Sequence, residues 1–158
     1  MLQRLAAVAA ELGIPFEAVS LAQLGAEADV IISITSAFAP SLLDAHVRPG
    51  THIACMGTDT KGKQELEAAV LARATVFTDE IAQAVTIGEA QHAIAAGLIT
   101  QDAIYEMGAV VNGTHPGRTS TDEITVFDGT GVGLQDLAVA SAVVDLAVAK
   151  GVATIVEF

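Results

Sequence analysis

THIACMGTDTKGKQEL, residues 51–66, is the stretch from which the fold of this chain can be worked out. Its first six residues, 51–56, mix β-branched and small apolar side chains, which is typical of a short buried strand. Gly57 ends that strand, and polar residues follow it up to Lys63. Open α/β sheets bind ligands outside the carboxyl ends of their strands, so Asp59 and the lysines after it are candidates for chemistry. The alternative is a solvated surface loop, and the segment alone leaves both interpretations open.

The composition limits the classes of protein to which the chain can belong. Its 158 residues suffice for one domain with a core, which must be aliphatic because Trp is absent and aromatic residues make up only 4%. Nineteen acidic against seven basic residues give a formal net charge of −12, which argues against nucleic acid as a partner. Charged residues interrupt every apolar run before it reaches about 20 residues, so we expect no membrane span. The single cysteine, Cys55, lies on a predicted strand, which favours a buried structural thiol and a reducing, cytoplasmic setting.

Predicted strands and helices alternate along the chain at short intervals. The predicted strands are 14–19, 29–35, 51–56, 75–79, 123–128 and 152–158. The predicted helices are 1–12, 20–28, 64–74, several pieces within 80–112, and 134–151, with a helical turn at 41–45. Such alternation is typical of βαβ units, so the expected fold class is α/β with a doubly wound, mainly parallel sheet.

The helix predicted at 134–151 is apolar around most of its circumference. A helix of this kind is normally buried between two layers of a protein. The rest of this chain has too little material to cover it, so we expect the helix to need a partner surface.

A second loop of interest, GTGVG at 129–133, lies between a strand and that helix. This order has the outline of a dinucleotide-binding turn, although the spacing is G-x-G-x-G rather than G-x-G-x-x-G. The alternative is that the glycines let the strand end approach a neighbour closely. Asp128 and Asp136 flank the loop, and backbone N–H groups near Asp128 are an equally good explanation for its place. The four histidines show no metal-ligand spacing, so no metal site is expected.

Two blocks of sequence, GTDTKGKQEL at 57–66 and GRTSTDEITVFDGTGVGLQDLAVA at 117–140, resemble the ornithine cyclodeaminase/mu-crystallin family. The resemblance runs from about Ala28 to Phe158 and implies a Rossmann-like domain that binds NAD or NADP. It also implies an oxidoreductase acting on CH–NH2 or C=N groups. The chain ends at IVEF, as the alanine dehydrogenase and imine-reductase branches do. Its implied partner is therefore a small amino, imino or 2-oxo acid.

Two alternatives remain within the family. One is an ornithine cyclodeaminase, an ammonia lyase that uses NAD+ catalytically and regenerates it in each cycle. The other is a non-catalytic carrier of small ligands, like mu-crystallin. The retention of Asp59 and Lys63 favours an enzyme over a carrier, since a pure scaffold would not require them.

The resemblance also assigns roles to single residues. Asp59 matches the catalytic carboxylate proposed to exchange a proton with the amine or imine of the substrate. The residues that match cofactor-binding positions are Thr35, Gly57, Lys63, Gly129 and Thr130. Gly129 and Thr130 replace a Ser–Val pair of cyclodeaminases, so the hydroxyl contact is missing at Gly129.

Family members are about twice as long as this chain, which resembles their C-terminal half. The expected fold is therefore an incomplete Rossmann-like domain at 1–133, without the first βαβ unit and without the N-terminal domain. Residues 134–158 are expected to form a helix and a strand that return to the absent substrate and dimerisation domain. We expect a homodimer or larger assembly of the full-length protein. The chain alone is expected to be inactive, and to self-associate or require the missing half.

Overall fold

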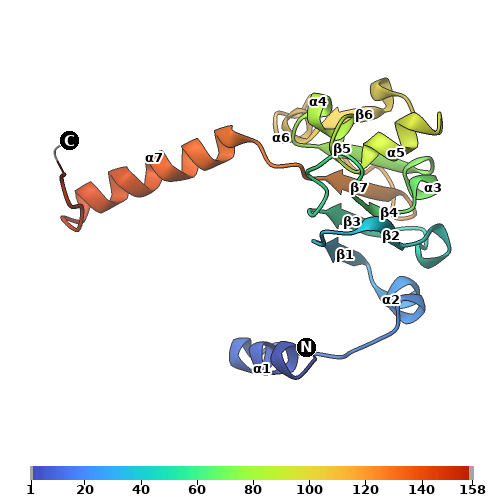
Figure 1. Cartoon of the computed structure of the whole chain (residues 1–158), viewed down its shortest axis with the longest axis horizontal. Helices are drawn as coiled ribbons and strands as arrows, with labels where there is room; N and C mark the ends of the chain where they lie inside the picture. Colours follow the sequence, from blue (N-terminus) through green and yellow to red (C-terminus); the bar gives the residue numbers. More distant parts are fainter. Residues whose placement is uncertain (1, 157–158) are drawn as a thin grey trace.

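Five parallel strands form the main sheet of the computed structural model, which describes residues 2–156 (Figure 1). The strands of the chain are β1 Val30–Ser33, β2 Phe38–Leu42, β3 His52–Cys55, β4 Gln64–Leu66, β5 Ala74–Thr78, β6 Ile104–Glu106 and β7 Ile124–Asp128. The helices are α1 Leu2–Leu12, α2 Leu21–Glu27, α3 Ala68–Leu71, α4 Ile81–Ala84, α5 Ala90–Ala95, α6 Met107–Val111 and α7 Gly133–Ala149, with 3-10 turns η1 Asp44–His46 and η2 Gln101–Ala103. The order β1-β3-β7-β5-β6, with every pair parallel, confirms the expected α/β class. β2 and β4 form a separate parallel pair.

One row of aliphatic side chains crosses the whole main sheet and forms the centre of the core. The strand register aligns the row, which consists of Ile31, Ile53, Val126, Val76 and Ile104. Each of these residues is at most 6% exposed. Helices α3, α4 and α5 supply further buried members of the same cluster, among them Val70, Leu71, Ala84, Ala90 and Ala93. Burial of this face stabilises the fold, because each large aliphatic side chain contributes about 1.5–3 kcal/mol.

The opposite face of the sheet is covered only in part. Near β5 and β6, the ring of Phe77 packs against those of Tyr105 and His115 and is 4% exposed. At the β1 edge, by contrast, Val30 and Ile32 are 58% and 71% exposed. Strands of a parallel sheet are normally buried on both faces, but this face of β1 has no cover among the described residues.

The N-terminal segment follows its sequence signals except at the predicted strand 14–19. Gly13, at φ 67°, ends α1, and the Ser20 hydroxyl caps α2 by accepting from the Gln23 N–H at 3.1 Å. Residues 14–19 are exposed and unpaired, so the prediction of a strand is wrong for this structure. A strand requires a neighbour for its backbone hydrogen bonds, and no described segment lies beside this one.

The predicted helix at 64–74 is replaced by β4 and the four-residue α3. The backbone N–H groups of Glu65 and Leu66 donate to the Glu89 carboxylate, and that of Gln64 donates to the Ala37 carbonyl. These tertiary acceptors replace the carbonyls that a helix would provide, so the helical pattern of this segment is overridden.

Three other local predictions need correction. The expected turn at 41–45 is the end of β2 followed by η1, and the region 80–112 contains β6 as well as short helices. β6 is a strand because it pairs with β5, and a sequence pattern of three residues does not predict such a tertiary pairing. Of the predicted strand 152–158, residues 152–156 form no strand, and 157–158 lie outside the described part.

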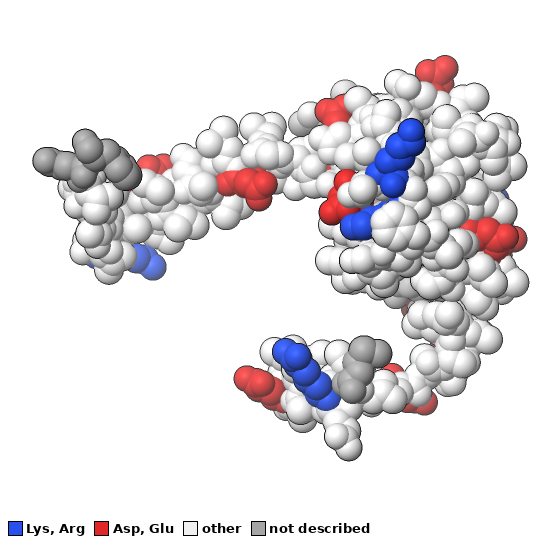
Figure 2. Space-filling model, viewed as in Figure 1, with Lys and Arg blue, Asp and Glu red and all other residues white. Residues whose placement is uncertain are grey.

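Helix α7 projects away from the sheet (Figure 1). None of its 17 residues is buried, and its surface carries few charges (Figure 2). The expectation that the chain cannot cover this helix is therefore confirmed. No described helix is long and apolar enough to cross a membrane.

Candidate functional site

The carboxyl ends of β1, β3 and β7 bring most of the predicted site residues to one edge of the sheet. Thr35 follows β1, residues 57–63 follow β3, and Gly129 follows β7. Backbone hydrogen bonds continue past the strand ends, from Met56 N to Ser33 O at 2.8 Å and from Gly129 N to Cys55 O at 2.9 Å. We call Thr35, residues 57–63 and residues 129–130 the carboxyl edge.

Gly57 is required by close approach of the backbone. A Cβ atom at this position would lie 2.1 Å from the Thr35 carbonyl oxygen and 2.4 Å from the Thr35 nitrogen. Backbone atoms cannot give way to such a contact as the end of a flexible side chain can. Glycine therefore lets the loop after β3 start directly beside Thr35.

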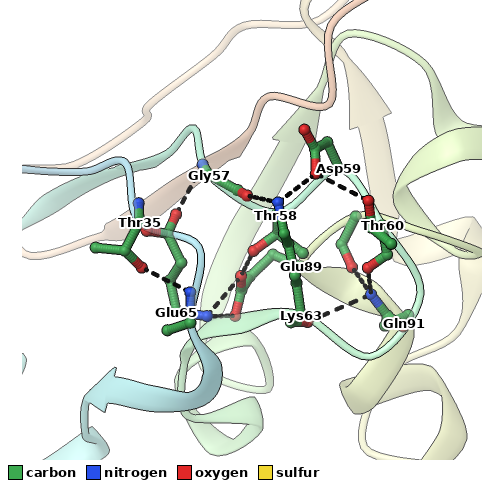
Figure 3. A network of polar contacts seen from close by, with 11 residues as sticks. Thr35, Gly57, Thr58, Asp59, Thr60, Lys63, Glu65, Glu89 and Gln91 are labelled. Carbon is green, nitrogen blue, oxygen red and sulfur yellow. Dashed lines mark hydrogen bonds and ion pairs between the residues drawn. The ribbon is translucent and has the colours of Figure 1, made fainter.

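Asp59 and Lys63 form an ion pair on this loop (Figure 3). The Asp59 Oδ1 atom lies 2.7 Å from Lys63 Nζ and also accepts from the Thr60 hydroxyl at 3.1 Å. The hydrogen bond from Lys63, followed by that from Thr60, lowers the pKa of Asp59 from its ordinary value. Asp59 is thus an exposed carboxylate at neutral pH, suited to pair with a cationic nitrogen or to accept a proton from one.

Two side chains of α5 fix the far end of the same loop. Gln91 Oε1 accepts from the Gly62 N–H at 2.7 Å, and Gln91 Nε2 donates to the Gly88 carbonyl at 2.9 Å. His92 Nε2 lies 2.9 Å from the Lys63 carbonyl oxygen. The loop that carries Asp59 is therefore anchored to a helix of the core. Nothing in the sequence around Gln91 and His92 indicates this role.

Three buried carboxylates, those of Glu65, Glu89 and Asp128, lie under the carboxyl edge, and each is at most 1% exposed. Glu89 accepts from the Thr58 hydroxyl at 2.6 Å and from the Leu66 N–H at 2.7 Å (Figure 3). Asp128 accepts from the backbone N–H groups of Glu89 and Ala90, at 2.9 and 3.0 Å. The interpretation of Asp128 as satisfied by backbone donors is confirmed.

Burial is the main influence on the pKa values of Asp128 and of the neighbouring Cys55. It raises the pKa of Asp128 to about 7, against the opposing effect of its two N–H donors. It also raises the pKa of the Cys55 thiol, and the neighbouring carboxylates of Glu89, Asp128 and Glu65 add to that effect. Cys55 is therefore a protonated thiol, and its burial confirms the prediction of a buried structural thiol.

We expect the free energy of unfolding to rise as the pH falls from about 8 to about 5. The folded-state pKa of Asp128, about 7, lies above the ordinary value of 3.8, so the folded state binds this proton more tightly. The gain is fully present below the unfolded pKa and is lost as the pH rises through about 7. The part of this gain that appears between pH 8 and pH 5 is expected to be about 2–4 kcal/mol.

Urea unfolding at several pH values measures this dependence. Asp128→Asn should flatten it, whereas Asp102→Asn, at an exposed position, should leave it unchanged. A stability that falls steadily between pH 8 and pH 5 would contradict the expectation.

The first donors of the glycine loop 129–133 are already paired within the chain. The Asp79 carboxylate accepts from Thr130 N at 3.2 Å, from Thr130 Oγ1 at 2.8 Å and from Gly131 N at 2.6 Å. Burial acts to raise the pKa of Asp79, but these hydrogen bonds outweigh it and lower the pKa. An anion beside Thr130 and Gly131 would therefore meet the Asp79 carboxylate instead of the free N–H groups of a pyrophosphate turn.

The alternative interpretation of this loop is supported at Gly129. A Cβ atom there would lie 2.6 Å from Met56 Sδ, so the glycine leaves room for the flexible Met56 side chain that follows β3. Asp136 lies on the exposed helix α7, apart from the carboxyl edge. Asp79, which organises the loop, was missed because an acid at the end of a short strand also suits an ordinary turn.

The fold recurs in proteins of known activity. The model of the ornithine cyclodeaminase/mu-crystallin family matches residues 2–151. The chain belongs to this family. It is 69% identical over 157 residues to the iminosuccinate reductase of Paracoccus denitrificans. This alignment covers 99% of this chain and 49% of the reductase.

Solved structures of the family superpose closely on this member. The iminosuccinate reductase of P. denitrificans in complex with NAD+ has a TM-score of 0.95 at 68% identity, over 100% of this chain and 49% of that one. An archaeal alanine dehydrogenase dimer with bound NAD has a TM-score of 0.92 at 32% identity, over 99% of this chain and 49% of that one. The Thermococcus litoralis Δ1-pyrroline-2-carboxylate reductase, in complex with NADH and L-proline, has a TM-score of 0.88 at 26% identity. The superposition covers 94% of this chain and 47% of that one. The chain spans about half the length of the relatives that it matches, in agreement with the half-length resemblance seen in the sequence.

Proposed function

We propose that this chain is the C-terminal half of an NAD(P)H-dependent imino-acid reductase, with iminosuccinate as its first candidate substrate. The observation that carries the proposal is the Asp59–Lys63 pair on an anchored loop at the carboxyl edge. The 69% identity to an iminosuccinate reductase supports the choice of substrate. The pair provides the carboxylate that the chemistry of a C=N group requires.

The residues of the carboxyl edge fit the nicotinamide end of a dinucleotide. They offer the Lys63 ammonium and the hydroxyls of Thr35 and Thr130 as polar partners, and Gly57 and Gly129 leave room beside them. When bound, the reduced nicotinamide supplies a hydride to the C=N carbon. At 129–133 the donors of Thr130 and Gly131 are paired with the Asp79 carboxylate, whose negative charge opposes a pyrophosphate, so we place the pyrophosphate site in the half that this chain does not contain.

Asp59 acts on the substrate nitrogen in this proposal. Its carboxylate is ionised and pairs with the positive charge of a protonated imine, which becomes an amine when the hydride arrives. In the direction of amine oxidation, the same carboxylate accepts a proton from the ammonium group. Lys63 keeps the carboxylate in the ionised form that both steps need.

The division of the chain follows from the same proposal. Residues 1–133 form the remaining part of the Rossmann-like domain, and residues 134–158 lead into the substrate and dimerisation domain. The absence of buried residues in α7 supports this division. The dimeric archaeal alanine dehydrogenase supports a homodimer for the complete protein.

The test completes the chain with the N-terminal half of the P. denitrificans iminosuccinate reductase, which gives what we call the reconstituted enzyme. Oxaloacetate and ammonia condense to iminosuccinate, and one NAD(P)H with one proton reduces it to aspartate. We expect loss of absorbance at 340 nm and formation of aspartate in equal amounts.

Ornithine with NAD+ is the contrasting assay. Release of ammonia without net NADH formation would favour the cyclodeaminase alternative. A folded reconstituted enzyme that reduces no imino acid would contradict the proposal.

A further inference from the structure

We propose that Glu65 is a positioning residue, whose buried carboxylate bridges the ends of β1 and β3 and thereby sets Thr35 and the Asp59 loop at a fixed separation. This inference rests on the proposed function, because its consequence is the alignment of a cofactor-contacting and a proton-accepting residue. Neither the sequence pattern nor the family resemblance assigns a role to Glu65.

The backbone ladder between the two strands stops just before the carboxyl edge. Its last hydrogen bond runs from Met56 N to Ser33 O at 2.8 Å. Beyond it, the N–H groups of Thr35 and Gly57 both donate to the Glu65 side chain and not to the other strand. Buried or half-buried donors of this kind need an acceptor, because an unpaired one costs about 1–3 kcal/mol.

Glu65 supplies that acceptor to both strand ends at once. Its Oε1 atom accepts from the Thr35 N–H at 2.5 Å and from the Ser33 hydroxyl at 2.6 Å. Its Oε2 atom accepts from the Gly57 N–H at 2.9 Å (Figure 3). The two oxygens of one planar group thus face different strands, and their fixed spacing sets the distance between the strands.

The backbone of Glu65 is itself held in place by the buried carboxylate of Glu89. Glu65 lies on β4, and its own N–H donates to the Glu89 carboxylate at 3.1 Å. The residue is 1% exposed, so water does not compete for its oxygens. Gly57 fits against Thr35 with no space for a Cβ atom, which means that a small change in separation alters this contact directly.

Amide hydrogen–deuterium exchange of the 158-residue chain tests the bridge without any substitution. The N–H groups of Thr35 and Gly57 lie outside the strands, yet both should exchange at least about 10²-fold more slowly than an unprotected amide. Exchange of either group at the unprotected rate would overturn the proposal.

Glu65→Gln is the matching variant, because it preserves size while turning one acceptor into a donor. Whichever way the amide is oriented, its NH2 group faces a backbone N–H, so at least one of the two groups should lose protection. In the reconstituted enzyme, we expect kcat to fall about 10²-fold through misalignment. We also expect KM for NADH to rise about tenfold, as after the loss of one good hydrogen bond.

The rise in KM separates positioning from simple loss of folded protein, which would lower kcat alone. Glu123→Gln is the control, since the Glu123 carboxylate accepts from the Thr119 N–H at 2.6 Å and the Thr75 hydroxyl, away from the carboxyl edge. It should leave kcat and KM unchanged. Wild-type kinetics in Glu65→Gln would overturn the proposal. An inactive wild-type reconstituted enzyme would instead refute the proposed function, and exchange at Thr35 and Gly57 would still decide the role of Glu65.

Discussion

Replacement of Asp59 by alanine is expected to lower turnover of the reconstituted enzyme by about 10²–10⁴-fold, the usual range for a lost acid–base group. The variant removes the only carboxylate on the loop at 57–63, and Lys63 then presents an unpaired positive charge to a cationic substrate nitrogen. Initial rates with iminosuccinate and NADH measure the effect. Asp102→Ala removes an exposed carboxylate on η2 and should leave turnover unchanged.

The pH dependence of kcat/KM separates a chemical role of Asp59 from a structural one. The bonds from Lys63 and Thr60 lower the pKa of Asp59, so the wild-type rate should stay level as the pH falls to the ordinary carboxyl range. Lys63→Met removes the first of these bonds and should move the acidic fall in rate to higher pH. Unchanged turnover in Asp59→Ala would remove this residue from the mechanism.

The strands that the sequence predicted well are those buried on at least one face. Apolar runs identified β1, β3, β5 and β7 with boundaries close to the observed ones, because burial selects the side chains of the strand itself. The short strands β4 and β6 were missed. Their backbone groups bond to distant partners, namely the Glu89 carboxylate and β5, and a local pattern carries no information about such partners.

In the candidate site too, the residues with a local sequence signal were predicted and those held by distant partners were not. Asp59 and Lys63 were candidates because they follow a predicted strand, where open α/β sheets bind ligands, and because the family resemblance assigns them roles. Glu65 and Glu89 were assigned to helices, where an acidic residue normally faces solvent. They are buried because their oxygens accept backbone N–H groups from loops distant in the sequence, so only the folded structure reveals them.

Self-association of the 158-residue chain at micromolar concentration is the second large effect that we expect. Large aliphatic residues of α7, all between 54% and 73% exposed, are Leu134, Leu137, Val139, Val143, Val144, Leu146 and Val148. At about 1.5–3 kcal/mol for each large side chain fully buried, covering even half of this surface contributes several kcal/mol. That gain is comparable to the net stability of a whole domain, about 5–15 kcal/mol, so a second copy of the chain should cover the helix.

Sedimentation of the wild-type chain beside two variants tests this expectation. The double variant Leu137→Glu with Val144→Glu places two charges seven residues apart on one side of α7 and should shift the chain toward monomer. Val111→Glu changes a residue on α6 that is 79% exposed and should leave the association state as it is. An NADH titration of the same samples should show no binding in the micromolar range, because Asp79 occupies the Thr130 and Gly131 donors of the 129–133 loop and places a negative charge there. A stable wild-type monomer that binds NADH at micromolar concentration would contradict both parts of this prediction.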